Sequence, residues 1–172
     1  QSESNLGTGT RVIGNEFQNF SDIGIFLYYQ DYPVVDKNIL TANDGGANFQ
    51  TGIIVSESAN NIAITKNQVF LSALNDNYGI SLYGSVASAD NRGLIANNFT
   101  SMSSASFANE GIGIMDCGYL DIFHNTVLIH DGSTRSSKPK SGTNAGISIS
   151  FYNIDPGFGS INILNNIIHG IA

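Results

Sequence analysis

Cysteine is almost missing from this sequence, since Cys117 is its one cysteine among 172 residues. A single cysteine excludes an internal disulfide framework, and it excludes zinc and iron–sulfur sites that need several thiolates. Cysteine usage therefore gives no indication of the compartment in which the chain works.

Charge is also scarce, because Asp, Glu, Lys and Arg together make up 12% of the residues. Fourteen acidic residues against seven basic ones give a formal net charge of -7. An acidic chain repels phosphate groups, and no basic stripe interleaved with aromatic residues is present. Nucleic acid is therefore not an expected partner.

Long apolar runs are missing as well. Runs such as residues 53–55 fall far short of the roughly 20 residues that a membrane-spanning helix needs, so we expect no membrane insertion. Near Gln1 there is no basic region followed by an apolar stretch, so no intact signal peptide is recognisable. The length and a hydrophobic content of 41% suit one domain with a core over residues 1–172.

Two short patterns alternate along the chain. The first is Gly-Ile, any residue, then Leu, Val or Ile, and it begins at Gly24, Gly52, Gly79, Gly111 and Gly146. The second is an aliphatic residue, two others, Asn, one other and an apolar residue. It marks six asparagines, although the final apolar residue is missing after the second of them: Asn15, Asn43, Asn67, Asn97, Asn125 and Asn166. Successive asparagines are 24 to 41 residues apart, and the two series interleave without a break.

Each pattern is typical of a short strand, because its aliphatic residues lie two apart and face the same side. Strands this short bury a face only by stacking on copies of themselves. Asparagine tolerates the left-handed backbone conformation, so we expect a bend at each asparagine and a column of hydrogen-bonded amides between coils. The sequence thus predicts an all-β, single-stranded solenoid, a parallel β-helix of about six coils.

These repeats resemble the right-handed parallel β-helices of the pectate-lyase-like superfamily. The Asn- and Ser-rich texture, with HNTV at His124 and LNNI at Leu164, resembles repeat regions of large secreted bacterial surface proteins, including type IX secretion substrates. The resemblance implies a secreted or cell-surface location. Residues 170–172 begin another Gly-Ile strand, so we expect a segment of a longer protein whose solenoid ends are capped by further coils or a partner chain.

Residues 111–131 hold the densest set of reactive side chains, including Cys117, His124 and His130. Because this stretch aligns with the other coils, we interpret it as one more repeat, with Cys117 as a packed thiol. The three histidines, of which His169 is the last, share no rung, so no metal site is predicted. Glu16 and Asp44 both follow a turn asparagine, and calcium could bridge them, although carboxylates held apart by solvent are the simpler expectation.

Enzymes of this fold use outward-facing residues, and the outward positions of the Gly-Ile strands form two rows. The first row is Phe26, Ile54, Ser81, Gly113 and Ser148, and the second is Tyr28, Ser56, Tyr83, Met115 and Ser150. Glycosidases need two carboxylates, and calcium-dependent lyases need clustered acids with a basic residue. Neither row contains them, so no catalytic residue is predicted.

Two features could contact a polysaccharide or cell-surface glycan. Phe26, Tyr28 and Tyr83 offer flat rings that stack on sugars, unless the insertion at residues 30–38 folds over them. The long insertion at residues 131–146 carries basic side chains that suit an acidic polysaccharide, although a flexible solvated loop is the alternative: Arg135, Lys138 and Lys140.

Three functions remain open at this point. The favoured one is a non-catalytic β-helical module that serves as a structural stalk, an adhesin or a carbohydrate-contact surface. The others are a fragment of a polysaccharide lyase or glycoside hydrolase, and a trimeric capsule-binding protein similar to phage tail spikes.

Overall fold

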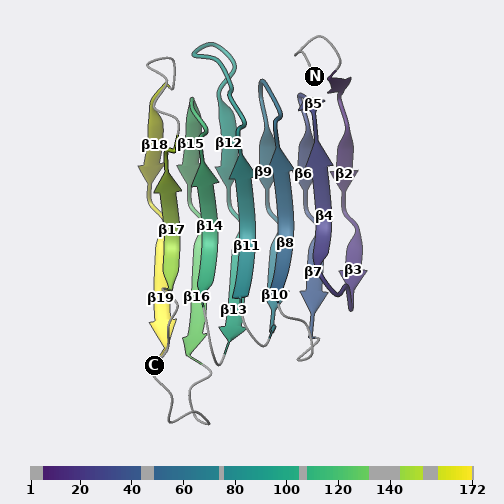
Figure 1. Ribbon diagram of the computed structural model, residues 1–172, viewed down its shortest axis with the longest axis vertical. Coiled ribbons are helices and arrows are strands. Elements are labelled where there is room, and N and C mark those ends of the chain that lie inside the picture. The colour runs from purple at the N-terminus through teal and green to yellow at the C-terminus, as the bar shows by residue number, and fades with distance from the viewer. Residues whose placement is uncertain are drawn as a thin grey trace.

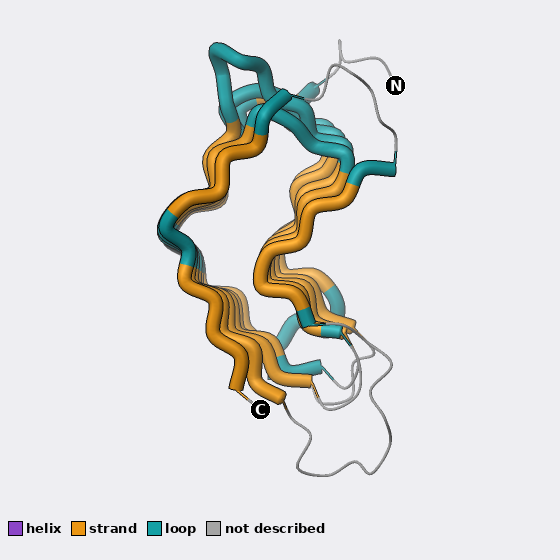
Figure 2. The backbone as a smooth tube through the Cα atoms, turned by 90° about the vertical axis from the view of Figure 1, so that its left-hand side faces the viewer, coloured by secondary structure: helices purple, strands orange, loops and turns teal. Residues whose placement is uncertain are grey.

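The computed structural model describes residues 6–43, 49–73, 76–104, 108–131, 144–152 and 159–171. These residues form nineteen strands, and every pairing between strands is parallel. Figure 1 shows the coils side by side in chain order, and Figure 2 shows successive coils superposed when the molecule is turned by 90°. None of the described residues forms a helix long and apolar enough to cross a bilayer. The predicted all-β architecture of about six stacked coils is confirmed.

The coils contribute their strands to three sheets, of which the β11 sheet has five strands and the β12 and β13 sheets have six each, and we name each sheet after a central strand. The β11 sheet contains β4 (Ile23–Tyr28), β8 (Phe49–Ser56), β11 (Asp76–Tyr83), β14 (Asn109–Met115) and β17 (Ala145–Ser150). The β12 sheet contains β2 (Arg11–Ile13), β6 (Val34–Asp36), β9 (Ala63–Thr65), β12 (Gly93–Ala96), β15 (Leu120–Phe123) and β18 (Ile161–Leu164). The β13 sheet contains β3 (Glu16–Gln18), β7 (Ile39–Ala42), β10 (Gln68–Leu71), β13 (Phe99–Ser104), β16 (Thr126–Asp131) and β19 (Ile167–Ile171). The short strands β1 (Gly7–Thr8) and β5 (Gln30–Asp31) pair beside them.

The core is a set of aliphatic stacks that run from coil to coil. The isoleucines of the Gly-Ile pattern are in register across all five strands of the β11 sheet: Ile25, Ile53, Ile80, Ile112 and Ile147. The three in the middle are completely buried. Burying one such side chain contributes roughly 1.5–3 kcal/mol, so repetition along the stack supplies the stability that a single short strand lacks.

The glycine before each isoleucine is required for close packing of the sheets. A Cβ atom on Gly52 would lie 2.4 Å from Cγ1 of Val69 in the opposite β13 sheet and 2.6 Å from the carbonyl oxygen of Gly79. The glycine and the following isoleucine therefore occupy two consecutive inward positions. This breaks the simple alternation of the strand, and the residue before the glycine faces outward.

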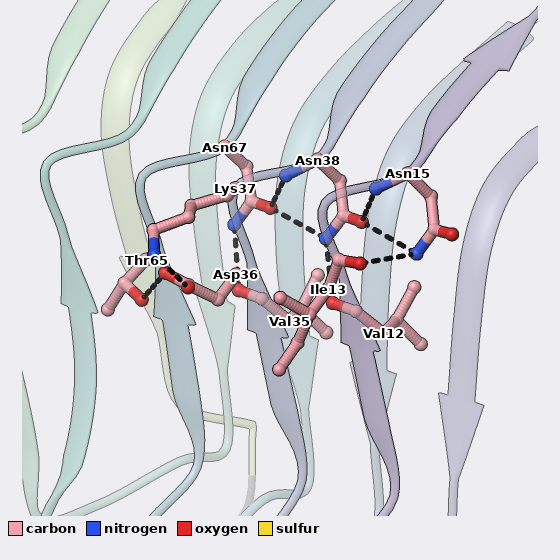
Figure 3. A network of polar contacts seen from close by, with 9 residues as sticks. All are labelled: Val12, Ile13, Asn15, Val35, Asp36, Lys37, Asn38, Thr65 and Asn67. Atoms are coloured by element: carbon pink, nitrogen blue, oxygen red, sulfur yellow. Dashed lines mark hydrogen bonds and ion pairs between the residues drawn. The ribbon is translucent and has the colours of Figure 1, made fainter.

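An asparagine ladder lines the corner between the β12 and β13 sheets. Figure 3 shows three of its rungs, and the complete ladder is Asn15, Asn38, Asn67, Asn98, Asn125 and Asn166. In each of the first five rungs the side-chain amide donates to the Oδ1 atom of the next rung, and the backbone N–H donates to the same atom. For Asn67 these two distances to Asn98 Oδ1 are 3.0 and 2.9 Å, and its Nδ2 also donates to Val35 O at 2.9 Å.

The predicted positions of two rungs are wrong. Asn43 is exposed after β7, and Asn38 takes its place in the ladder. Asn97 lies one residue before the rung that Asn98 provides. The apolar position after Asn98 is filled by buried Thr100, which a search for apolar residues does not recognise.

The bend lies one residue earlier than predicted. Left-handed φ angles between 54° and 67° belong to the residue before each rung: Gly14, Lys37, Lys66, Asn97, His124 and Asn165. That residue turns the chain, and the asparagine that follows directs its amide along the stack. The residue at the turn varies among the coils, whereas the residue after it is asparagine in all six rungs. The repeat in the sequence therefore comes from the ladder asparagines and not from the turn residues.

Two further corners carry their own ladders. Asn77 donates to Asn109, and Asn109 donates to Asn144, each at 3.0 Å, two residues before the pattern glycines. At the third corner the backbone N–H of Ser58 donates to Ser85 Oγ at 3.2 Å, and that of Ser85 donates to the sulfur of Cys117 at 3.4 Å. The three corners together fix the register of the coils.

Candidate functional site

The outer face of the β11 sheet carries the two predicted outward rows. Strand pairing places each row in register across the five strands. Phe26 and Tyr28 lie at the β4 end of the sheet and expose 55% and 46% of their surface. Their ring centroids are 5.9 Å apart, and the ring of Tyr28 lies 4.0 Å from that of Tyr29.

The segment at residues 30–38 does not cover these rings. It contains β5 and β6 and ends at the ladder residue Asn38, so it forms part of an ordinary coil. The alternative that an insertion folds over the aromatic residues is therefore wrong for the described part of the chain.

Tyr83 lies apart from Phe26 and Tyr28. It shares an outward row with Tyr28, but Ser56 of β8 stands between them. Instead, Tyr83 lines a hollow with a volume of about 390 Å³ over β11, β14 and β17. Other residues of this hollow are Tyr78, Glu110, Gly113, Ser148 and Tyr152.

Glu110 lies across the floor of this hollow. Its Oε1 atom accepts a hydrogen bond from the Ser148 hydroxyl at 2.7 Å. A Cβ atom on Gly113 would lie 2.0 Å from the same Oε1 atom, so only glycine leaves room for the carboxylate in this position. Beside Gly113 in the row, the Ser81 hydroxyl is buried and has no hydrogen-bond partner among the described residues.

Sequence reasoning missed Glu110 and Tyr78, because both precede a pattern glycine. Strict alternation from Ile112 places Glu110 inside the coil, whereas the two inward positions at Gly111 and Ile112 turn it outward. A glycine repeated within a strand is a signal for such an irregularity, and this signal could have identified the preceding residue as an outward-facing one.

The polar groups of the hollow are one carboxylate, several hydroxyls and phenols. Burial raises the pKa of Tyr78, and the charges of Asp76 and Glu110 raise it further. The Tyr78 phenol therefore stays protonated and can donate a hydrogen bond. The described lining contains no Lys, Arg or His and only one Asp or Glu residue, so it lacks the pair of carboxylates that glycoside hydrolysis uses.

The remaining candidates are placed in part. Arg135, Lys138 and Lys140 lie outside the described residues, and so does Asp44, the proposed calcium partner of Glu16. The interactions that these residues make therefore stay predictions. Glu16 itself is exposed on β3 and accepts a hydrogen bond from Gln18.

The stretch at residues 111–131 is one coil of the repeat. Burial raises the pKa of the Cys117 thiol to about 11, and the sulfur also donates to the carbonyl oxygen of Met115 at 3.2 Å. Asp121 forms an ion pair with Arg92 at 2.8 Å, and the hydrogen bond from Arg92 is the main reason that its pKa is lowered. These contacts give both side chains structural roles.

Comparison with known families gives one result. A family model described as "Periplasmic copper-binding protein (NosD)" matches residues 2–144. The family consists of right-handed parallel β-helices, which confirms the expected fold and its handedness. The family is described as periplasmic, which agrees with the extracytoplasmic part of the expected location, while secretion or display at the cell surface stays a prediction. No curated protein and no solved structure matches the chain.

Copper in the family description raises the question of whether this chain offers copper ligands. Among the described residues no three His, Cys, Asp or Glu side chains gather into a group that could hold a metal ion. The Cys117 thiol is engaged in a buried ladder, and its raised pKa disfavours the thiolate that copper binds. His130 and His169 lie on neighbouring strands of the β13 sheet but are not opposite each other, since His130 pairs with Ile171 and His169 with Leu128. The described residues do not fit a copper site.

Proposed function

This chain belongs to the NosD family, and we propose that it is a non-catalytic, extracytoplasmic β-helical module whose β11 sheet contacts carbohydrate. The observation that carries the proposal is the exposed aromatic pair Phe26 and Tyr28 on a flat sheet face. Such rings present apolar surface to the C–H faces of sugars.

The rigidity of the sheet supports this proposal. The rows are held in register by parallel pairing on both sides of β8, β11 and β14, and by ladders at all three corners. A ligand that binds a face of this kind meets side chains that are already positioned, which lowers the entropic cost of association. An extended glycan also matches a face that runs along several coils.

Binding without turnover is the expected behaviour. The hollow on this face offers one carboxylate, whereas glycoside hydrolysis uses a pair of them. Incubation of the chain with a panel of polysaccharides should therefore leave reducing ends and unsaturated ends unchanged. Release of either kind of product would favour the polysaccharide lyase or hydrolase alternative.

Replacement of Phe26 and Tyr28 by alanine tests the binding face directly. If each ring contributes about 1 kcal/mol, the double variant should bind the retained polysaccharide on the order of 30-fold more weakly. Leu94→Ala is the matched control, because Leu94 is an exposed apolar residue on the outside of the β12 sheet. Equal affinity of the double variant and the control for the polysaccharide would refute the proposed binding face.

We also propose that a further coil or a partner chain covers the β17–β19 end of the solenoid. Several apolar side chains are exposed there, including Ile163 and Ile168 at 43% and 53%. Exposed apolar strands with unpaired edges favour pairing with another strand. Sedimentation distinguishes the possibilities, because a stable trimer would favour the tail-spike alternative over a monomeric module.

A further inference from the structure

The hollow beside Gly113 differs from the aromatic pair at Phe26 in shape and in charge. The first outward row changes from a large ring at Phe26 to an aliphatic residue at Ile54 and then to the small residues Ser81, Gly113 and Ser148. The missing side chain at Gly113 leaves room for the Glu110 carboxylate, whose Oε1 atom lies 2.0 Å from the place that a Cβ atom would take, so small residues and this carboxylate form the floor of the hollow. Its volume of about 390 Å³ falls within the roughly 300–1,000 Å³ that small-molecule sites occupy.

Aromatic residues stand around this depression. Tyr78 and Tyr83 come from β11, and Tyr152 lies just after β17 with 74% of its surface exposed. The backbone N–H of Tyr152 donates to Asp116 Oδ1 at 2.7 Å, which ties this residue to the preceding coil. A ring-shaped ligand in the hollow would thus meet apolar ring surface and phenol hydroxyls around a polar floor.

The floor of the hollow is anionic. Ser148 occupies only Oε1 of Glu110, and a carboxylate oxygen accepts more than one hydrogen bond, so Glu110 keeps capacity for a ligand. Asp76 and Glu110 are both close enough to raise the pKa of Tyr78, and no basic side chain belongs to the described lining. A ligand carboxylate would therefore meet like charge without a compensating cation, whereas a hydroxyl or an ammonium group would donate to Glu110.

We infer that this hollow is a binding subsite for one ring of an uncharged or amine-bearing sugar, and that Glu110 selects against uronic acids. The subsite rests on the proposed carbohydrate-contact function and adds the class of sugar that is accepted. Glu110 acts as a hydrogen-bond acceptor for the sugar, Gly113 leaves room for the Glu110 carboxylate, and Ser148 holds that carboxylate in place. The Ser81 hydroxyl adjoins this floor and is a buried polar group with an unused hydrogen-bonding capacity among the described residues.

The experiment measures affinity of the complete 172-residue chain for three oligosaccharides of equal length. The neutral probe is cellotetraose, the amine-bearing probe is a chitosan tetramer, and the acidic probe is tetragalacturonate. Titration calorimetry should detect the neutral and amine-bearing probes, with the amine-bearing probe bound more tightly. Tetragalacturonate should bind at least tenfold more weakly than the neutral probe.

Two variants separate charge from shape. Glu110→Gln keeps the side-chain size, and it should weaken chitosan binding about tenfold and narrow the gap to tetragalacturonate. Gly113→Ala should weaken binding of the neutral and amine-bearing probes, because its methyl group would lie 2.0 Å from the present position of Glu110 Oε1 and the carboxylate would have to move. Circular dichroism establishes whether each variant is folded. If Gly113→Ala does not fold, Glu110→Gln alone still tests the subsite.

The possible outcomes distinguish the subsite from the broader function. Binding that is lost in the Phe26 and Tyr28 variants but unchanged in Glu110→Gln and Gly113→Ala would overturn the subsite and leave the contact surface standing. Tetragalacturonate bound as tightly as the neutral probe would also overturn the subsite. No binding of any probe or polysaccharide to the wild-type chain would overturn both.

Discussion

Adjacent residues Asn97 and Asn98 provide a sharp test of the ladder, because they are chemically identical and differ by one position in the coil. Asn98 is buried, and its Nδ2 donates to Ile64 O at 2.8 Å and to Asn125 Oδ1 at 3.0 Å. Its Oδ1 accepts from the backbone and side chain of Asn67 at 2.9 and 3.0 Å. Asn97 is exposed and has a φ of 57°.

Replacement of Asn98 by alanine removes all four side-chain hydrogen bonds and leaves buried partners unsatisfied. At about 1 kcal/mol for each bond, the loss in unfolding free energy is about 4 kcal/mol. That is a large part of the roughly 5–15 kcal/mol by which a domain is usually stable. The matched variant Asn97→Gly retains the left-handed turn without strain and should change the free energy by less than about 0.5 kcal/mol.

Urea unfolding followed by circular dichroism measures both variants against the wild type. The expected result is a much lower midpoint for Asn98→Ala and a nearly unchanged midpoint for Asn97→Gly. Similar losses in the two variants would refute the assignment of Asn98 as the rung and of Asn97 as the turn.

Four further predictions concern packing, ionisation and access to the buried thiol. Gly111→Ala should lower the unfolding free energy by about 1–3 kcal/mol, because its Cβ would lie 2.3 Å from Val127 Cγ1 and 2.5 Å from Gly146 O. Gly170→Ala is the control and should be neutral, because a Cβ atom there meets open space. Equal urea midpoints of the two variants would contradict the close packing. The folded-state pKa of Cys117 is raised from 9.0 to about 11, so the contribution of the neutral thiol to stability is complete below pH 9 and is lost between pH 9 and 11. The unfolding free energy of the wild type should therefore fall faster over this pH range than that of Cys117→Ser. The thiol should also resist a disulfide reagent at about pH 8 until the chain unfolds, and rapid labelling of the folded chain would argue against burial. Arg92→Ala should lower the unfolding free energy by about 1 kcal/mol near neutral pH, because it removes the ion pair with Asp121. The difference in unfolding free energy between wild type and variant should shrink as pH falls through the lowered pKa of Asp121. A difference that persists in acid would exclude the ion pair as its cause.

The coil architecture was predictable because its signals repeat. Isoleucines such as Ile53, Ile80 and Ile112 recur after glycine at similar spacings, and a wrong assignment in one coil is corrected by the others. The corner amides repeat as well, so a hydrogen-bonded asparagine column followed from the sequence. These features depend on nearest-neighbour stacking, which every coil must satisfy.

The errors occurred where one coil departs from its neighbours. Thr100 replaces an apolar residue beside the true rung Asn98, and a threonine methyl group packs inside without being recognised as apolar. Val35 and Asn38 satisfy the pattern fully, but the irregular spacing of their coil made residues 30–38 look like an insertion. Local spacing was therefore a weaker guide than the identity of the buried residues.

The candidate site was less predictable than the fold. Phe26, Tyr28 and Tyr83 were predicted to face outward because they follow the strand alternation. That Tyr83 lies apart from the other two was not predicted, because it depends on the coil to which each residue belongs. Glu110 was missed because Gly111 reverses the alternation, and its contact with Ser148 joins residues 38 positions apart. Such a contact depends on register between coils, which no single repeat specifies.

The central claim is that the coils are superposed in register. The most direct measurement of this is the distance between the first and the last residue of one outward row. Tyr28 and Ser150 end the second outward row and are separated by four strand spacings, which at about 4.8 Å each gives about 19 Å between the backbones. Spin labels at these two positions in a Cys117→Ser background allow the separation to be measured by pulsed electron paramagnetic resonance. A narrow distribution near about 20 Å is the predicted result. A broad distribution, or one centred beyond about 35 Å, would contradict the stacked register.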